Sequence, residues 1–305
     1  MESNIPLVSV IVPNYNHEQF IKQRLESILS QNYANFEIII LDDCSTDNSR
    51  EILLEYANNP HVSYCVFNEV NSGSPFKQWE KGINLAKGEY IWVAESDDLC
   101  KSNFIESLIK MFRANVAMVF CASINIDENG LFTGSNRWAN SLNSNKWKSN
   151  YCNDGESEIK DYLKFRNFIP NASSVIFKKN VVNDNFFAND FFYCGDWFFW
   201  LKILQNGRIS YLSDELNFFR KHAATTRVVK NFLEEKKRFK EYTFITKKYT
   251  SRREFWTNYR KYIWIVNECI TKSSQFNFIQ LIQLKMPYNL KIIFWLKYFR
   301  LKFKK

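Results

Sequence analysis

Several features that would mark an exported, zinc-binding or membrane-spanning protein are missing from this sequence. The seven cysteines are odd in number, include no Cys-x-x-Cys pair and do not combine with a histidine at zinc-like spacing. The first residues, Met-Glu-Ser-Asn-Ile-Pro, lack a basic segment followed by an apolar one, and no run of about 18 apolar residues occurs. We therefore expect a cytoplasmic protein with reduced thiols, without a secretory signal or a membrane span.

Acidic residues are scarce in the last quarter of the chain. Residues 228–305 hold 19 Lys and Arg against 5 Asp and Glu, whereas residues 1–227 hold 22 against 27. Aromatic side chains alternate with these cations, as in residues 288–305, so 228–305 is expected to be a basic, helical C-terminal region. Its helices either lie on an anionic membrane surface, which we favour, or pack on the rest of the protein with a solvated basic face. Nucleic-acid binding is not expected, because no recognised motif accompanies the charge.

Hydrophobic patterning predicts strands that alternate with helices in the first half of the chain. Strands are expected at 7–12, 36–41, 62–67, 90–93 and 116–122, and helices at 18–30, 49–57, 76–86 and 99–113. The first strand is expected to stop at Pro13, which has no N–H to donate. The alternation predicts an α/β fold with a mostly parallel central sheet flanked by helices, in which ligands bind beyond the carboxyl ends of the strands.

The second half of the chain is less regular. The stretch 133–153 is rich in Asn and Ser, has no clear period and is expected to be a long functional loop or an insertion. The remaining predicted elements are helices at 161–167 and 197–205 and strands at 173–177, 209–212 and 216–219.

Polar clusters follow three of the predicted strands and should therefore meet at one edge of the sheet. They are Pro13-Asn14-Tyr15, Asp42-Asp43 and Glu95-Ser96-Asp97-Asp98. Packing the three carboxylates of the last cluster together costs repulsion, which a bound Mg²⁺ or Mn²⁺ would relieve. Two simpler interpretations stay open. Ser96-Asp97-Asp98 caps a helix that starts at Leu99, and Asp42-Asp43 only stabilises a turn.

Five motifs, taken in order, resemble those of family 2 glycosyltransferases, which have the GT-A fold. They are residues 8–16, 42–47, 86–91 running into 95–98, Gly195-Asp196-Trp197 and Arg220-Lys221-His222, and the resemblance covers about residues 7–227. It implies a GT-A catalytic domain over 1–227, with a nucleotide-binding half over about 1–125 and an acceptor-binding half over about 126–227. The helical region 228–305 follows this domain.

The resemblance also implies a role for each motif. Pro13 and Tyr15 would line the base pocket, and Asp43 would accept a hydrogen bond from the base. The other implied residues are Glu95 and Asp97 for the nucleotide, Asp97, Asp98 and His222 for the metal, and Asp196 as catalytic base. A divalent cation, Mn²⁺ or Mg²⁺, would stabilise the departing diphosphate, and the reaction would invert the anomeric carbon in one in-line step.

Simpler roles stay open for two of these residues, and the sequence departs from the family pattern in places. Asp196 precedes an apolar run, as a helix N-cap does, although its aromatic neighbours would raise its pKa toward useful basicity. The simpler interpretation of His222, one of three histidines, is a surface residue without a ligand. The family usually has Asp at the position of Glu95 and an acid at that of Gly195. The loop 71–82 departs from the small residues and Arg-Asn pair usual there, so Lys77 or Lys81 is expected to face the phosphates.

These observations predict an enzyme that moves a sugar from a nucleotide-diphosphate sugar, most simply a UDP-sugar, to a glycan or lipid-linked acceptor. Its expected place is cell-surface polysaccharide synthesis at the inner membrane face. A degenerate transferase that binds a nucleotide or glycan without turnover is the alternative. A nucleotidyltransferase is disfavoured, because Pro13-Asn14-Tyr15-Asn16 is not the glycine-rich, basic loop that such enzymes place after the first strand.

Overall fold

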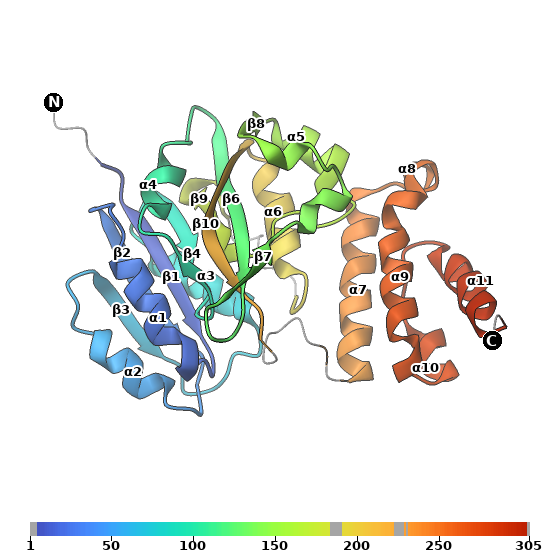
Figure 1. The fold of residues 1–305 in the computed structure, drawn as a ribbon, viewed down its shortest axis with the longest axis horizontal. Coiled ribbons are helices and arrows are strands. Elements are labelled where there is room, and N and C mark those ends of the chain that lie inside the picture. Colours follow the sequence, from blue (N-terminus) through green and yellow to red (C-terminus); the bar gives the residue numbers. More distant parts are fainter. Residues whose placement is uncertain (1–4, 184–190, 223–228, 230, 304–305) are drawn as a thin grey trace.

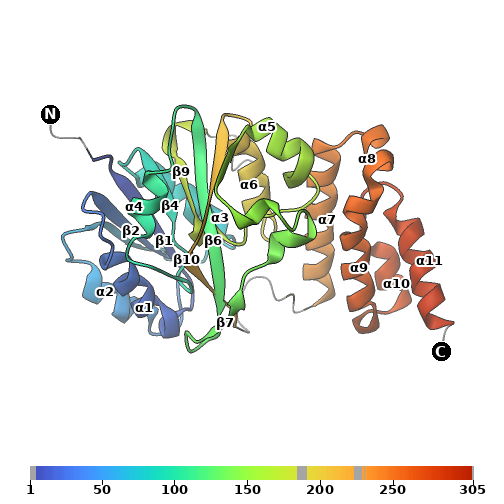
Figure 2. The same ribbon diagram turned by 45° about the horizontal axis from the view of Figure 1, so that its top comes forward.

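The structure, a computed structural model, describes residues 5–183, 191–222, 229 and 231–303, with the backbone alone at Trp138. It consists of a twisted sheet with helices on both faces and a group of C-terminal helices packed against one end (Figures 1 and 2). All seven cysteines are unpaired. Among the described residues, no helix has the length and apolar character needed to cross a bilayer.

The strands form one sheet whose order is β3-β2-β1-β4-β9-β6-β10-β5, with β7 paired to β6 and β8 paired to β10. Their bounds are β1 (Val8–Asn14), β2 (Phe36–Asp42), β3 (Val62–Phe67), β4 (Tyr90–Val93), β5 (Leu99–Cys100), β6 (Val116–Ile126), β7 (Phe132–Ser135), β8 (Tyr151–Asn153), β9 (Val175–Lys178) and β10 (Arg208–Arg220). Strands β3, β2, β1 and β4 are parallel, as are β6 and β10, whereas β9 runs antiparallel between β4 and β6. The predicted mostly parallel α/β fold is confirmed.

Helices cover both faces of the sheet because successive side chains of a strand point to opposite faces. The helices before the C-terminal region are α1 (Glu18–Leu29), α2 (Ser49–Tyr56), α3 (Pro75–Leu85), α4 (Phe104–Ile109), α5 (Gly155–Glu158) and α6 (Gly195–Leu204). In β2, Ile38 and Ile40 belong to the core under α1, α2 and α4, whereas Ile39 and Leu41 belong to the core under α3 and α6.

Strand β1 extends through Pro13 to Asn14, so the prediction that it stops at Pro13 is wrong. Its pairing with β4 ends at Ile11, whose carbonyl accepts a hydrogen bond from the Ala94 N–H. Alternate residues of a parallel strand bond to the same neighbouring strand, so the backbone of Pro13, like that of Ile11, faces the β4 side of β1. At Pro13, β4 has already ended. The missing N–H therefore removes no ladder bond.

The helix predicted over 99–113 is also wrong in its first part. Leu99 and Cys100 form β5 and pair with Phe218 and Asn217 of β10, and α4 begins only at Phe104. The acidic cluster before Leu99 therefore caps no helix, which removes the capping interpretation of Ser96-Asp97-Asp98.

One further prediction fails where the chain pairs irregularly. The strands expected at 209–212 and 216–219 are one strand, β10, whose register against β6 shifts between Leu212 and Glu215 and again before Asn217. This irregularity interrupts the alternation of apolar residues, so the sequence pattern shows two short strands. The stretch 133–153 contains part of β7 and all of β8, and its remaining segments include 3₁₀ turns.

The C-terminal region is helical, as predicted. Its helices are α7 (Phe232–Tyr249), α8 (Arg252–Asn258), α9 (Ile263–Lys272), α10 (Phe278–Gln283) and α11 (Leu290–Lys302), and α7 lies beside α6 in both views (Figures 1 and 2). They share a core that includes Tyr262, Leu281 and Phe294 and also Phe165 from the first part of the chain. The predicted domain boundary at 227/228 lies outside the described residues.

Candidate active site

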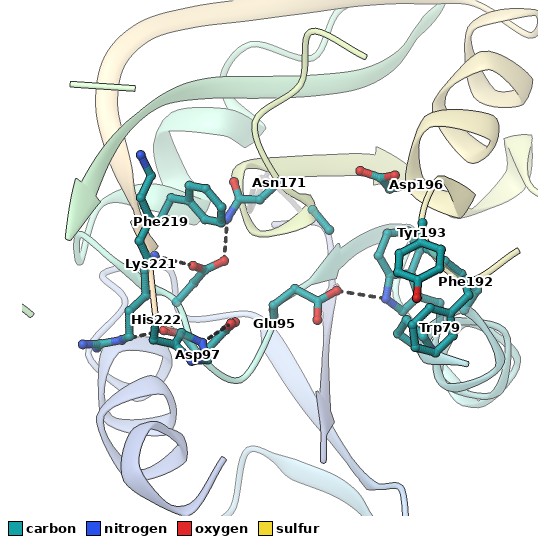
Figure 3. A pocket seen from close by; sticks show the side chains of 15 residues that line it. Trp79, Glu95, Asp97, Asn171, Phe192, Tyr193, Asp196, Phe219, Lys221 and His222 are labelled. Atoms are coloured by element: carbon teal, nitrogen blue, oxygen red, sulfur yellow. Dashed lines mark hydrogen bonds and ion pairs between the residues drawn. The ribbon is translucent and has the colours of Figure 1, made fainter. Parts of the chain in front are cut away.

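A cavity of about 320 Å³ lies where β4 and β10 end and α3 and α6 begin. Figure 3 shows its lining: Pro75, Phe76, Trp79, Glu95, Asp97, Asp98, Asn171, Ala172, Phe192, Tyr193, Asp196, Phe219, Arg220, Lys221 and His222. Five of the residues predicted from sequence are among them: Glu95, Asp97, Asp98, Asp196 and His222. The acidic stretch after β4 and the Arg-Lys-His stretch after β10 therefore converge.

Asp97 and His222, on one wall of the cavity, form a group of potential metal ligands with His17, which lies just outside the lining. The Nε2 atom of His222 lies 3.0 Å from Oδ2 of Asp97, and Nδ1 of His17 lies 2.7 Å from Oγ of Ser96. One ligand atom from each of His17, Asp97 and His222 lies within 4.8 Å of the others. Two imidazoles and one carboxylate suit a divalent transition metal better than Mg²⁺, which prefers oxygen ligands.

The pKa values of Asp97 and His17 are both lowered. Burial acts to raise the pKa of Asp97, but the hydrogen bond from His222 and the charges of both histidines outweigh it and lower that pKa. Burial also lowers the pKa of His17, against the opposing charge of Asp97. An ionised carboxylate and a neutral imidazole are the forms that coordinate a metal.

His17 was not predicted as a site residue. It comes four positions after Pro13, between β1 and α1, so its sequence position already places it at the ligand-binding edge of the sheet. The motif after β1 is otherwise polar and suggests only a nucleotide contact. The proximity of His17 to Asp97 comes from the tertiary structure.

Asp98 is buried and serves as a junction between separate segments. Its Oδ1 accepts a hydrogen bond from the Arg220 N–H at 2.9 Å, and its Oδ2 accepts one from the Asn171 amide. Burial, followed by the nearby charge of Asp97, raises the pKa of Asp98 to about 7, and the Arg24 guanidinium opposes this. Both oxygens of Asp98 accept hydrogen bonds from protein groups, and its role as a metal ligand stays a prediction.

Glu95 points away from the Asp97–His222 pair and toward α3 (Figure 3). Its Oε1 accepts a hydrogen bond from Trp79 Nε1 at 3.1 Å, and its own N–H donates to Ser173 Oγ at 3.1 Å. Burial, then the charges of Asp97 and Asp98, raises the pKa of Glu95 to about 8. Glu95 therefore lies in the middle of the cavity as a largely protonated acid at neutral pH.

The residues predicted to bind the base lie apart from this lining. Asp43 is buried, and its Oδ1 accepts hydrogen bonds from Asn68 at 2.7 Å, the Ser72 N–H at 2.9 Å and Gln78 at 2.8 Å. Tyr15 is 46% exposed, and Pro13 is buried in β1. A contact of Pro13, Tyr15 and Asp43 with a base stays a prediction.

A second cavity of about 410 Å³ shares His222 with the first. The residues after β1 and β2 line it, together with the start of α1 and the turn between β6 and β7: Asn16, His17, Glu18, Gln19, Phe20, Thr46, Asp47 and Glu128. The two cavities therefore meet at His222.

The cations expected to face phosphate are directed elsewhere. Lys77 Nζ donates to the Ser72 carbonyl at 3.0 Å, and Lys81 Nζ donates to Asn68 Oδ1 at 2.7 Å. Lys221, which follows β10, lines the cavity beside His222. It is the lysine best placed to meet an anionic ligand there.

Asp196 lies across the cavity from Asp97 and His222 (Figure 3). It stands in the first turn of α6, whose N-cap is Cys194, so the interpretation of Asp196 as the N-cap is wrong. Its Oδ2 accepts a hydrogen bond from Asn167 Nδ2 at 3.0 Å, and its Oδ1 accepts one from the Trp197 N–H at 2.7 Å. These two donors fix the orientation of the carboxylate.

A glutamate from the C-terminal helices holds the turn that precedes Asp196. The Glu241 carboxylate on α7 accepts hydrogen bonds from the backbone N–H groups of Phe192 at 3.0 Å, Tyr193 at 2.9 Å and Cys194 at 2.8 Å. Burial raises the pKa of Glu241, and the three donors oppose that effect. The C-terminal region therefore helps to position Asp196, which sequence reasoning did not anticipate.

Gly195, one of the departures from the family pattern, is explained by a neighbouring ring. A Cβ atom at Gly195 would lie 2.4 Å from Cε2 and 2.5 Å from Cδ2 of Phe76. Phe76 belongs to the loop and helix that also depart from the pattern. The two departures are thus complementary, since the ring fills the space that a side chain at position 195 would need.

Comparison with known proteins gives a consistent result. The family model described as Glycosyl transferase family 2 matches residues 9–185. Glycosyltransferase GlyG of Streptococcus pneumoniae is 40% identical over 123 residues, which cover 40% of this chain and 40% of GlyG. An Escherichia coli protein named UDP-Glc:alpha-D-GlcNAc-diphosphoundecaprenol beta-1,3-glucosyltransferase WfgD is 28% identical over 68% of this chain and 73% of its own length. The match to GlyG thus spans well under two thirds of that protein.

The fold is also found in a solved structure. Residues 1–349 of S. aureus TarS, in complex with UDP, superpose with a TM-score of 0.63 at 20% identity, covering 90% of this chain and 76% of that one. The expected GT-A fold is thereby confirmed.

We expect Gly195→Ala to lower the free energy of unfolding by about 1–3 kcal/mol through overpacking against Phe76, although alanine is intrinsically favoured in a helix. In a Phe76→Ala background the same change should be neutral or stabilising, because the ring is gone. Urea denaturation of the four proteins measures the coupling in a double-mutant cycle. An equal cost of Gly195→Ala in both backgrounds would contradict the proposed complementarity.

The raised pKa of Glu95 predicts a pH-dependent stability in metal-free protein. The folded state holds this proton more tightly than the unfolded chain, so the contribution is complete below about pH 4.5 and is lost as the pH rises to about 8. Glu95→Gln keeps an acceptor for Trp79 but cannot ionise. We expect its Tm in EDTA to equal that of the wild type at pH 4 and to exceed it by a growing margin toward pH 8.5. A Tm difference between the two proteins that does not change with pH would contradict a raised pKa at Glu95.

Proposed function

The chain belongs to glycosyl transferase family 2, and from this premise we propose that it transfers a sugar from a UDP-sugar to a hydroxyl of a glycan or lipid-linked acceptor. The observation that carries the proposal is that Asp196 lies across one cavity from Asp97 and His222, which form a group of three potential metal ligands with His17 of the adjoining cavity. This arrangement provides a base for the nucleophile and a cation site for the leaving group, which are the two needs of the reaction.

The choice of donor rests on similar proteins. The name of WfgD specifies UDP-glucose, and the TarS structure holds UDP. We propose the same nucleotide here, with Pro13, Tyr15 and Asp43 at the base and Glu95 and Asp97 toward the ribose and donor sugar. Lys221 is placed to face the diphosphate from the end of β10.

For the metal we propose Mn²⁺, held by Asp97 and His222 as predicted and by His17 in addition. Asp98 is the third predicted ligand of the proposed set, and its oxygens also accept hydrogen bonds from Asn171 and Arg220. When bound, the cation would act as a Lewis acid that stabilises the negative charge of the leaving diphosphate.

Asp196 then acts on the acceptor. Its carboxylate takes the proton of the acceptor hydroxyl while the oxygen attacks the anomeric carbon and the bond to the diphosphate breaks, with inversion. Asn167 and the Trp197 N–H keep the carboxylate oriented toward that hydroxyl. Precise placement of the base is worth several orders of magnitude in rate.

We expect Asp196→Asn to lower sugar transfer by about 10²–10⁴-fold, because the amide cannot accept the proton. Affinity for UDP and Mn²⁺ should stay unchanged, since Asp196 lies across the cavity from both proposed sites. The measurement is transfer from labelled UDP-sugars to a cell-envelope glycan and lipid extract, with Mn²⁺, Mg²⁺ or EDTA. Calorimetry with UDP and Mn²⁺ accompanies it.

Two variants complete this experiment. His17→Ala should weaken Mn²⁺ binding by about tenfold or more. Asp161→Asn, at an exposed carboxylate, is the matched control and should change neither sugar transfer nor Mn²⁺ affinity. Full transfer by Asp196→Asn would refute its role as base. Wild-type protein that binds UDP but transfers none of the sugars would favour the alternative, a binding protein without turnover.

We further propose that the enzyme works in the cytoplasm, at the inner membrane face, in cell-surface polysaccharide synthesis. Helix α11 supports this, because it exposes Ile292 (59%), Leu296 (68%) and Leu301 (55%) among its lysines and Arg300, and the uncharged helix α10 also exposes apolar side chains, Ile279 (66%) and Ile282 (46%). Apolar contact combined with about 1 kcal/mol per Lys or Arg near anionic lipid would hold such a surface at the membrane.

Flotation with vesicles of phosphatidylglycerol and phosphatidylethanolamine tests the membrane proposal. The wild-type chain should float, and added salt should reduce flotation. Leu296→Ser combined with Ile292→Ser should reduce flotation several-fold, whereas Leu131→Ser, at a site that is 65% exposed in the sheet-containing part, should not. Equal flotation of all three proteins would argue against α11 as the contact surface.

A further inference from the structure

A third cavity, of about 430 Å³, adjoins the candidate active site on the side of the C-terminal helices. Its lining is Arg166, Asn167, Ile169, Pro170, Tyr193, Cys194, Asp196, Trp197, Arg238, Tyr242, Trp264 and Glu268. Tyr193 and Asp196 line both this cavity and the first one. The Asp196 carboxylate, proposed as the base, therefore borders both cavities. Of the two, only the first is lined by the potential metal ligands Asp97 and His222.

We propose that this cavity binds the acceptor, as a neutral pyranose unit of a glycan, and that α7 and α9 form one of its walls. The inference rests on the proposed function, because it uses Asp196 as the base that meets the acceptor hydroxyl. It extends the acceptor site beyond residues 126–227, where the sequence places it, to Arg238, Tyr242, Trp264 and Glu268.

The shape of the lining suits a sugar ring. Trp264 on α9 and Tyr242 on α7 have ring centroids 5.0 Å apart in an edge-to-face arrangement, and Trp264 is 6.2 Å from Trp197 of α6. Three elements thus contribute aromatic surface to one space. Apolar and aromatic walls with a few placed polar groups are typical of ligand pockets, and 430 Å³ is within their usual size.

The polar groups around these rings can satisfy hydroxyls. The Arg166 guanidinium lies 5.5 Å from the Trp264 ring centroid, and the Tyr242 hydroxyl donates to Glu268 at 3.2 Å. Glu268 also pairs with Arg238 at 2.8 Å. Guanidinium and carboxylate groups supply fixed donors and acceptors, respectively, which is the combination that adjacent sugar hydroxyls require.

The charge of the lining decides which sugars fit. Arg166 and Arg238 are balanced by Asp196 and Glu268, so the cavity has no excess cation to attract an acidic unit. Arg238 is already engaged by Glu235 and Glu268, so it is not free to pair with the carboxylate of a uronic acid. A neutral hexose or N-acetylhexosamine needs no such partner.

The rigidity of the cavity depends on the same helices. Trp264 Nε1 donates to the Phe165 carbonyl at 2.9 Å, and Glu241 on α7 holds the turn that carries Tyr193. The aromatic wall and Asp196 are therefore positioned by one set of contacts, which would align an acceptor hydroxyl with the base.

The experiment measures glycoside binding apart from nucleotide binding. The full chain with UDP and Mn²⁺ is titrated with p-nitrophenyl glycosides of glucose, galactose, N-acetylglucosamine and glucuronic acid, followed by calorimetry. At least one neutral glycoside should bind more tightly than the glucuronide. Trp264→Ala should weaken that binding by about tenfold, and Trp256→Ala, whose ring is 41% exposed on α8, should leave it unchanged.

Arg166→Gln is the second variant, because it removes a partly exposed side chain rather than a packed ring; it should weaken glycoside binding several-fold. UDP affinity should be the same in all four proteins. Any of three results would overturn the assignment of this cavity as the site of a neutral acceptor sugar. They are unchanged glycoside affinity in both Trp264→Ala and Arg166→Gln, no glycoside binding by the wild type, and preference for the glucuronide. Loss of UDP binding by the wild type would instead refute the proposed function.

Discussion

The buried carboxylate of Asp98 is the interaction on which the candidate site depends. A carboxylate removed from water must be hydrogen-bonded or paired, and Asp98 meets this need with the Arg220 N–H and the Asn171 amide. Arg220 in turn donates its Nε–H to the Asp97 carbonyl at 2.7 Å. The end of β10 is thereby fixed to the loop after β4, and His222 comes within 3.0 Å of Asp97.

The opposite wall is fixed from outside the sheet. Glu241 of α7 accepts three backbone N–H groups from the turn before α6, so a C-terminal helix positions the turn that leads into Asp196. Such a carboxylate is costly to bury, and its three charge-assisted bonds offset that cost. The basic region therefore contributes to the candidate site as well as being a candidate membrane surface.

Electrostatics in the cavity follow from the same burial. The Arg24 guanidinium lies 4.8 Å from the Trp92 ring centroid beneath the acidic loop, and its charge opposes the rise in the pKa of Glu95 and Asp98. Even so, both pKa values are raised, while that of Asp97 is lowered by its histidine neighbours. Three acids close in sequence thus take different protonation states, because each faces a different set of partners.

The sequence by itself determined the alternation of strands and helices and the mostly parallel sheet, and it predicted that the clusters after β1, β2 and β4 lie at one edge, because apolar periodicity and strand direction are local properties. That His222, after β10, belongs with the cluster after β4 was implied only by the family resemblance. The sequence could not locate β5 or show that β10 is continuous, since both depend on pairing with distant strands. Only the tertiary structure decided that His17 joins Asp97 and His222, that Phe76 fills the space beside Gly195, and that Glu241 holds the turn before Asp196. Each of these is a contact between segments far apart in the chain, and residue spacing along the sequence carries no information about such contacts.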